Sequence, residues 1–181
     1  MTIRAELTDL ILMVRGLIND PTGPDEQFAD EAIQSELDIE KQYYSRLKLI
    51  PLPDPDGAVY KWRSPVKYWD KDTVISDSAG VTIVPEQADY IAGLFTLSEA
   101  RNEAAITGFC YDVYAVSANL LTLWAGRIER DITKFSADGS SFEFAGEVNG
   151  KLNLASIYAK KSRSYGGAAV IGLVRNDHTA N

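Results

Sequence analysis

The residue types that most often perform chemistry are scarce in this sequence and far apart. The single cysteine, Cys110, lies in an apolar stretch, and the single histidine, His178, lies near the C-terminal end. A catalytic nucleophile needs a base within hydrogen-bond reach, and a zinc site needs several such ligands. Phosphate-binding glycine motifs and the G-x-S-x-G motif are also absent. We therefore expect no catalytic residue, no metal site and no cofactor, and a protein that is not an enzyme.

Two further groups of residues could bind a ligand. Glu36, Asp38 and Glu40 form an acidic run, but a paired-carboxylate site needs a cleft and a partner, so we interpret the run as solvated surface. Trp62 and Trp69, with Tyr68, could stack a ligand. Such aromatic residues more often form the core of their own module or anchor an interface. Trp62 and Trp69 are therefore also candidates for a subunit interface.

Composition narrows the class of protein. The chain has 181 residues, 45% of them hydrophobic, and a formal net charge of −8. An acidic chain is poorly suited to tight duplex binding, which depends on Lys and Arg. A lone cysteine fits a reducing cytosolic origin. Arg4 and Glu6 interrupt the early apolar run, so we expect no signal peptide. Asp112 and Arg127 bound the uncharged central run well short of the roughly 20 residues that span a bilayer, so we expect no membrane span.

The elements that would position these residues centre on a predicted helix over residues 108–132. Its apolar stripe would contain Phe109, Val113, Val116, Leu120 and Leu123. A second face is small and uncharged, and its residues are Ala115, Asn119, Thr122 and Gly126. Small side chains allow close packing of another backbone. That face could pack against the chain's own helices or against a neighbouring copy, so these four residues are subunit-interface candidates.

Three more helices are predicted by periodicity, over residues 2–18, 30–44 and 146–164. Prolines and alternating residues predict an antiparallel β-module over 47–106, with a hairpin turn at Asp77-Ser78-Ala79-Gly80. The apolar segment 168–175 beyond the last helix could bind a partner or fold back on the chain. The candidates for a partner-docking arm are Val170, Ile171, Leu173, Val174 and Arg175.

Together these elements predict an α+β fold. We expect a small bundle of about four helices around the long central helix, formed by residues 1–46 and 107–165. The β-module of residues 47–106 would be an insertion, and residues 166–181 would be an extended C-terminal arm.

The order of several motifs resembles the head–tail connector (adaptor) proteins of tailed bacteriophages. The resemblance covers the opening helix followed by Ile18-Asn19-Asp20-Pro21, and then residues 28–38. It continues in Thr107-Gly108-Phe109-Cys110-Tyr111-Asp112-Val113-Tyr114-Ala115, in the turn at residues 135–142, and in the closing helix from Leu152 to Lys161. The β-module is less typical of the family.

The resemblance implies a structural protein of the virion. Such proteins form a ring, often of twelve copies, in the neck between the portal and the tail or stopper protein, and DNA passes through the ring. The implied protein would be made in the host cytoplasm and would act in genome ejection without sequence-specific DNA contacts. Alternatives are another morphogenesis component, such as a tail terminator or completion protein, or a ligand-binding protein that uses the aromatic β-module.

Overall fold

The computed structural model describes residues 3–55, 57–132 and 141–162. The chain divides into two compact units. The first unit holds Met1–Met13 and Phe28–Asp112, and the second holds Val14–Gln27 and the chain from Val113 onward. Each unit is therefore assembled from two separate stretches of sequence.

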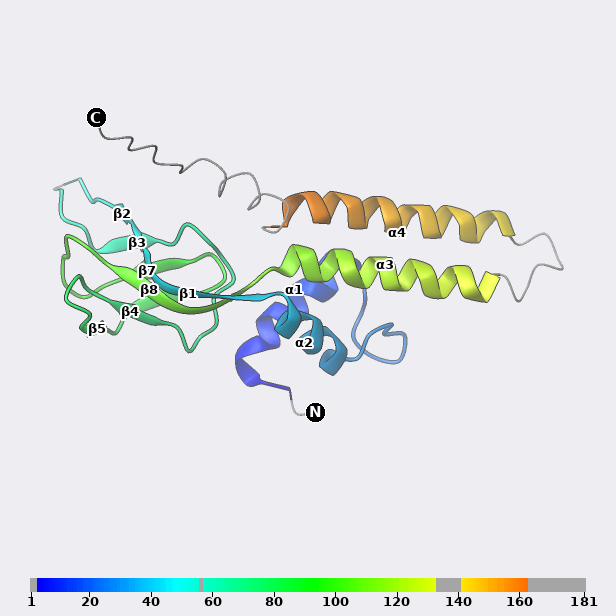
Figure 1. Cartoon of the computed structure of the whole chain (residues 1–181), viewed down its shortest axis with the longest axis horizontal. Helices are drawn as coiled ribbons and strands as arrows, with labels where there is room; N and C mark the ends of the chain where they lie inside the picture. The colour runs from blue at the N-terminus through cyan, green and yellow to red at the C-terminus, as the bar shows by residue number, and fades with distance from the viewer. Residues whose placement is uncertain (1–2, 56, 133–140, 163–181) are drawn as a thin grey trace, which may run out of the picture. The chain divides into compact units, whose positions relative to one another are not determined.

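Two antiparallel sheets of four strands each form most of the first unit (Figure 1). One sheet has the order β1-β8-β4-β5, with β1 at Lys41–Lys48, β8 at Ala105–Tyr111, β4 at Val74–Ser76 and β5 at Thr82–Ile83. The other has the order β2-β3-β7-β6, with β2 at Ile50–Leu52, β3 at Lys61–Arg63, β7 at Leu94–Thr96 and β6 at Gln87–Asp89.

The two sheets share one hydrophobic core. Strand alternation places Ile106 and Cys110 of β8 in that core and leaves Phe109 40% exposed on the outer face. Trp62 of β3 and Phe95 of β7 enter the same core from the other sheet. The buried cluster consists of Leu49, Trp62, Trp69, Ile75, Phe95, Leu97, Ala104, Ile106 and Cys110.

Short helices precede the first strand. A 3₁₀ turn at Ala5–Leu7 leads into α1 at Thr8–Ile18, and the division between the two units falls within α1. Helix α2 spans Asp30–Ile39 and buries Ile33 and Leu37. It ends where the N–H of Glu40 donates to the Glu36 carbonyl, and β1 begins at the next residue.

The second unit is dominated by two long helices, α3 at Val113–Ile132 and α4 at Ser141–Lys161, which lie side by side (Figure 1). They run antiparallel, because the Tyr114 and Tyr158 rings lie 5.8 Å apart and Lys151 Nζ lies 3.0 Å from the centre of the Trp124 ring. The buried residues of α3 are Val113, Ala115, Val116, Ser117, Ala118, Leu120, Leu121 and Ala125.

The predicted architecture, a helical bundle with a small β insertion, is wrong. Strands form two four-stranded sheets, and both sheets lie in the first unit. The sheets extend beyond the expected insertion at both of its ends, since β1 begins at Lys41 and β8 runs to Tyr111. The units therefore differ from the expected division at residues 46 and 107.

The predicted helix over residues 108–132 begins later, at Val113, because residues 105–111 form β8. Gly108 has a φ of 155°, outside the helical range, and a Cβ there would lie 3.0 Å from Thr73 Cα. Strand β8 also pairs on both of its edges, with β1 and β4. The backbone hydrogen bonds of two ladders therefore stabilise a strand here, although the spacing of Phe109 and Val113 would also suit a helix.

The predicted helix over residues 30–44 is also too long. Its last five residues enter the turn after α2 and then β1, where Tyr43 lies opposite Phe109 and Tyr44 opposite Gly108. Aromatic residues suit a pleated, half-buried surface, and sheet pairing decides their conformation here.

Other predictions are confirmed. Strands β4 and β5 pair as the predicted hairpin, with Gly80 at a φ of 85° in the turn. Helix α1 ends at Ile18, where the first predicted helix also ends. The closing helix is present as α4, although it begins earlier than expected. The turn at 136–139 and the arm at 166–181 lie outside the described residues.

Candidate functional site

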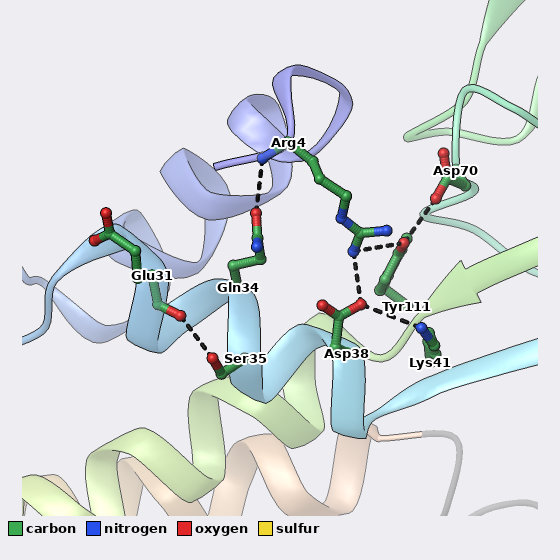
Figure 2. A network of polar contacts seen from close by, with 8 residues as sticks. All are labelled: Arg4, Glu31, Gln34, Ser35, Asp38, Lys41, Asp70 and Tyr111. Atoms are coloured by element: carbon green, nitrogen blue, oxygen red, sulfur yellow. Dashed lines mark hydrogen bonds and ion pairs between the residues drawn. The ribbon is translucent and has the colours of Figure 1, made fainter. Parts of the chain in front are cut away.

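A network of polar contacts joins the first residues of the chain to α2 and β8 (Figure 2). The backbone N–H of Arg4 donates to Gln34 Oε1 at 2.8 Å, and its guanidinium Nη2 lies 2.6 Å from Asp38 Oδ1. The same Nη2 lies 3.4 Å from the hydroxyl of Tyr111. Lys41 Nζ completes the cluster, 3.3 Å from Asp38 Oδ1.

Tyr111 is the buried centre of this network. Its side chain has no exposed surface, and its hydroxyl donates to Asp70 Oδ2 at 2.7 Å. Burial, followed by the hydrogen bond and the negative charge of Asp70, raises the pKa of Tyr111 above its usual value of 10.0. The phenol therefore stays protonated and acts as a donor between two strongly polar groups.

This network holds segments of the first unit together. Asp38 accepts from the Arg4 guanidinium, and Asp70 accepts from the Tyr111 hydroxyl. Among the described residues, no group of three or more His, Cys, Asp or Glu side chains could hold a metal ion. The arrangement fixes the N-terminal segment against α2 and β8.

A buried ion pair organises the loop after α1 in the second unit. Arg15 Nη1 lies 2.9 Å from Asp20 Oδ2, and the two side chains are 3% and 0% exposed. Asp20 Oδ1 accepts from the N–H of Gln27 at 2.7 Å, and Arg127 of α3 donates to the Gln27 carbonyl at 3.0 Å. These contacts hold the loop of residues 19–27 in place on α3.

The small, uncharged face of the predicted central helix is only partly exposed. Ala115 is buried at 9% exposure, whereas Asn119, Thr122 and Gly126 lie on the exposed side of α3. Leu123, on the same side, is 50% exposed. A Cβ added at Gly126 would meet no atom within 4 Å. Three of the four candidates are therefore accessible to another molecule.

Trp62 and Trp69 are core residues of the β unit, with exposures of 1% and 2%. At these exposures they offer neither a surface for stacking a ligand nor an anchor for a partner. Of the three roles considered from the sequence, they fill the core role. Trp69 Nε1 donates to Ser64 Oγ at 3.0 Å and to the Val66 carbonyl at 3.1 Å. Among the described residues, Trp62 Nε1 is one of two buried side-chain nitrogens without an acceptor.

Two open depressions lie on the β unit. One of about 400 Å³ is lined by residues of sheet β2-β3-β7-β6, and one of about 550 Å³ is lined by Asp77, Ser78, Ala100, Arg101, Asn102 and Glu103. The lining of the first depression is mixed and includes apolar side chains such as Leu52 and Leu94 as well as Lys61, Gln87 and Asp89. The second contains carboxylates and a guanidinium but no histidine or cysteine.

Sequence reasoning missed the contacts that join Arg4, Asp38 and Tyr111. Asp38 was interpreted as solvated surface, yet its side chain is 26% exposed and pairs with Arg4. The docking-arm candidates Val170, Ile171, Leu173, Val174 and Arg175 lie outside the described residues. In the part of the chain that the structure describes, no helix is long and apolar enough to cross a bilayer. Comparison of the chain with protein-family models, curated proteins and solved structures finds no match.

Proposed function

We propose that this protein is a head–tail connector (adaptor) of a tailed bacteriophage, with a structural rather than an enzymatic role. In this proposal copies of the chain form a ring, of about twelve by analogy with the family, in the neck of the virion. One side of the ring binds the portal protein and the other a tail or stopper protein. DNA passes through the ring during genome ejection without sequence-specific contacts.

One observation carries this proposal beyond the sequence resemblance. Gly126 lies in the interior of a 20-residue helix, where glycine costs about 1 kcal/mol relative to alanine. Apart from the backbone of the helix itself, no atom of the described residues lies within 4 Å of the position that a Cβ would take. Packing within the described chain therefore does not explain the glycine, whereas close approach of a neighbouring copy would.

The charge of the chain supports the same role. A net charge of −8 makes strong attachment to phosphates unfavourable, so DNA could slide past such a protein without being held. A head-to-tail interface between identical copies closes into a ring when its rotation allows. The exposed face of α3 provides a surface for such an interface that is separate from the buried face.

The test is the oligomeric state of the purified chain, alone and with its portal, measured by light scattering and negative-stain imaging. We expect rings, or binding to the portal, for the unaltered chain. Gly126→Leu should weaken assembly at least tenfold and leave the melting temperature nearly unchanged. A chain that stays monomeric and binds neither portal nor tail at micromolar concentrations would contradict the proposal.

Gly16→Leu is the matched control. Gly16 is also an exposed helical glycine with no atom within 4 Å of an added Cβ, but it lies in α1. The same substitution there should leave assembly intact. If both variants reduce assembly equally, the exposed face of α3 has no special part in it. Copurification with the tail tube instead of the portal would indicate a tail terminator or completion protein.

A further inference from the structure

The two lateral sides of the β unit are built from different pairs of edge strands. Strands β1 and β5 are the edges of one sheet, and β2 and β6 are the edges of the other. Only Leu49 separates β1 from β2, and only residues 84–86 separate β5 from β6. Such short connections place β1 beside β2 on one side of the unit, and β5 beside β6 on the other.

These two sides carry opposite charge. Residues 41–52, which contain β1 and β2, include Lys41 and Lys48 and no acidic residue, while their third basic residue, Arg46, directs its guanidinium to the turn after β4. Residues 81–89, which contain β5 and β6, include Glu86 and Asp89 and no basic residue. All five of these charged residues are exposed.

Each side also exposes apolar surface. On the basic side Tyr43 is 55% exposed and Ile50 39% exposed. On the acidic side Val81 is 60% exposed and Val84 81% exposed, the largest value among the exposed large hydrophobic residues described. Apolar centres with charged rims are typical of protein–protein interfaces.

Each basic residue of residues 41–52 already has a partner within its own copy, but the two lysines are held only weakly and can bind a second copy. Arg46 reaches across its sheet and donates to the carbonyl oxygens of Asp77 and Ser78, at 3.2 and 3.0 Å. Lys48 Nζ lies 3.4 Å from Glu103 with its side chain 74% exposed, and Lys41 pairs with Asp38 at 3.3 Å. Exposed ion pairs of this kind contribute little, so either lysine can exchange its partner at small cost.

We propose that the basic side of one copy, residues 41–52, binds the acidic side of a second copy, residues 81–89. The contact is heterologous, so every copy has one basic and one acidic side to offer, and the contact can repeat from copy to copy. Side chains rather than a continuous β-ladder make this contact. The register of β1 shifts between Tyr44 and Leu47, and Arg46 has a φ of 52°, an irregularity that blocks regular edge pairing.

The proposal concerns self-association of the β unit and does not depend on a role in the virion. It is tested in the full chain with two variants. Lys41→Glu with Lys48→Glu reverses the basic side. Glu86→Lys with Asp89→Asn reverses the acidic side and keeps the acceptor oxygen that Ala92 N–H uses.

We expect each variant to weaken self-association about tenfold in sedimentation velocity, because attraction between exposed charges becomes repulsion. An equimolar mixture of the two variants should restore it, since each reversed side then meets its complement. Association of the unaltered chain should weaken as the salt concentration rises from about 0.05 M to about 0.5 M. Circular dichroism melting verifies that each variant is folded.

The control is Lys67→Glu with Lys71→Glu, which changes the net charge as much as the basic-side variant does, at exposed residues of the same unit that lie outside both segments and outside the strands that pair with them. It should leave association unchanged. A chain that associates equally well with either side reversed overturns the edge contact and leaves the connector proposal standing. Edge-dependent association in a chain that never binds portal or tail overturns the connector proposal alone. A strict monomer at all concentrations overturns the edge contact.

Discussion

At the scale of single residues, the two buried tryptophans differ in one respect. Both are at most 2% exposed, but Trp69 Nε1 has two acceptors and Trp62 Nε1 has none. Replacement by phenylalanine removes a satisfied donor at Trp69 and an unsatisfied one at Trp62. Trp69→Phe should therefore lower the free energy of unfolding by about 1–2 kcal/mol more than Trp62→Phe does. Urea unfolding of both variants measures this difference, and equal losses would contradict it.

Tyr111 predicts a dependence of stability on alkaline pH. Its pKa is raised in the folded state, so the unfolded chain loses this proton first, near pH 10. Above that pH the unfolded state binds fewer protons than the folded state, and the free energy of unfolding decreases as the pH rises. The stabilisation from Tyr111 is thus fully present below its ordinary pKa and is lost above it.

Tyr111→Phe tests this dependence. At neutral pH the variant should lose about 2 kcal/mol of stability, since a buried hydrogen bond to a charged acceptor is removed. Between about pH 9 and about pH 11 its stability should decrease less steeply than that of the unaltered protein. Tyr43→Phe is the control, because Tyr43 is 55% exposed. Parallel pH profiles for all three proteins would show that Tyr111 does not supply the alkaline sensitivity.

The contacts of Arg4 show where prediction from sequence ends at this scale. Arg4 and Asp38 are 34 residues apart, and Arg4 and Tyr111 are 107 apart. No local spacing links them, and only the packed fold brings them together. By contrast, Cys110 lies among apolar neighbours in the sequence, and its exposure in the structure is 0%.

At the scale of elements, the close packing of Gly108 against Thr73 predicts that β8 does not tolerate a side chain at this position. A Cβ there would lie 2.6 Å from Thr73 Cγ2 and 3.0 Å from Thr73 Cα, on a residue with positive φ. Gly108→Ala should destabilise the protein by about 2–4 kcal/mol, because both strain and overlap must be accommodated. Gly16→Ala, at an open helical position, should instead stabilise it by about 1 kcal/mol. Thermal unfolding distinguishes the two, and a neutral Gly108→Ala would show that Thr73 can move away.

Residues 105–113 explain why helix periodicity misled at this scale. Ile106, Phe109, Cys110 and Val113 have helical spacing, while Ile106 and Cys110 also share one face of a strand. The choice depends on β1 and β4, which pair with β8 from distant parts of the sequence. The β4–β5 hairpin was predictable because its turn residues, Asp77 to Gly80, are local.

At the scale of the whole molecule, the division into two units follows long-range pairing. Lys41 lies opposite Tyr111 across the β1–β8 ladder, so the sheet closes over about 70 residues of chain. The α3–α4 hairpin then forms from consecutive elements, which is why its helices were the easier part to predict. The expected boundaries at 46 and 107 cut through the strands of one ladder, because sequence alone does not reveal which distant strands pair.

The last prediction concerns residues 168–181 and rests on their sequence alone. Deleting them removes the apolar run that contains Val170, Ile171, Leu173 and Val174. An apolar terminal segment of this kind can add a strand to a partner or fill a groove on it. The deletion should leave helix content and melting temperature nearly unchanged, as measured by circular dichroism, and should weaken copurification with the portal. Serine at those four positions in the full-length chain is the matched control for chain length and should have the same effect. A melting temperature lowered by more than about 5 °C in either variant would show that the segment packs into the core of its own chain.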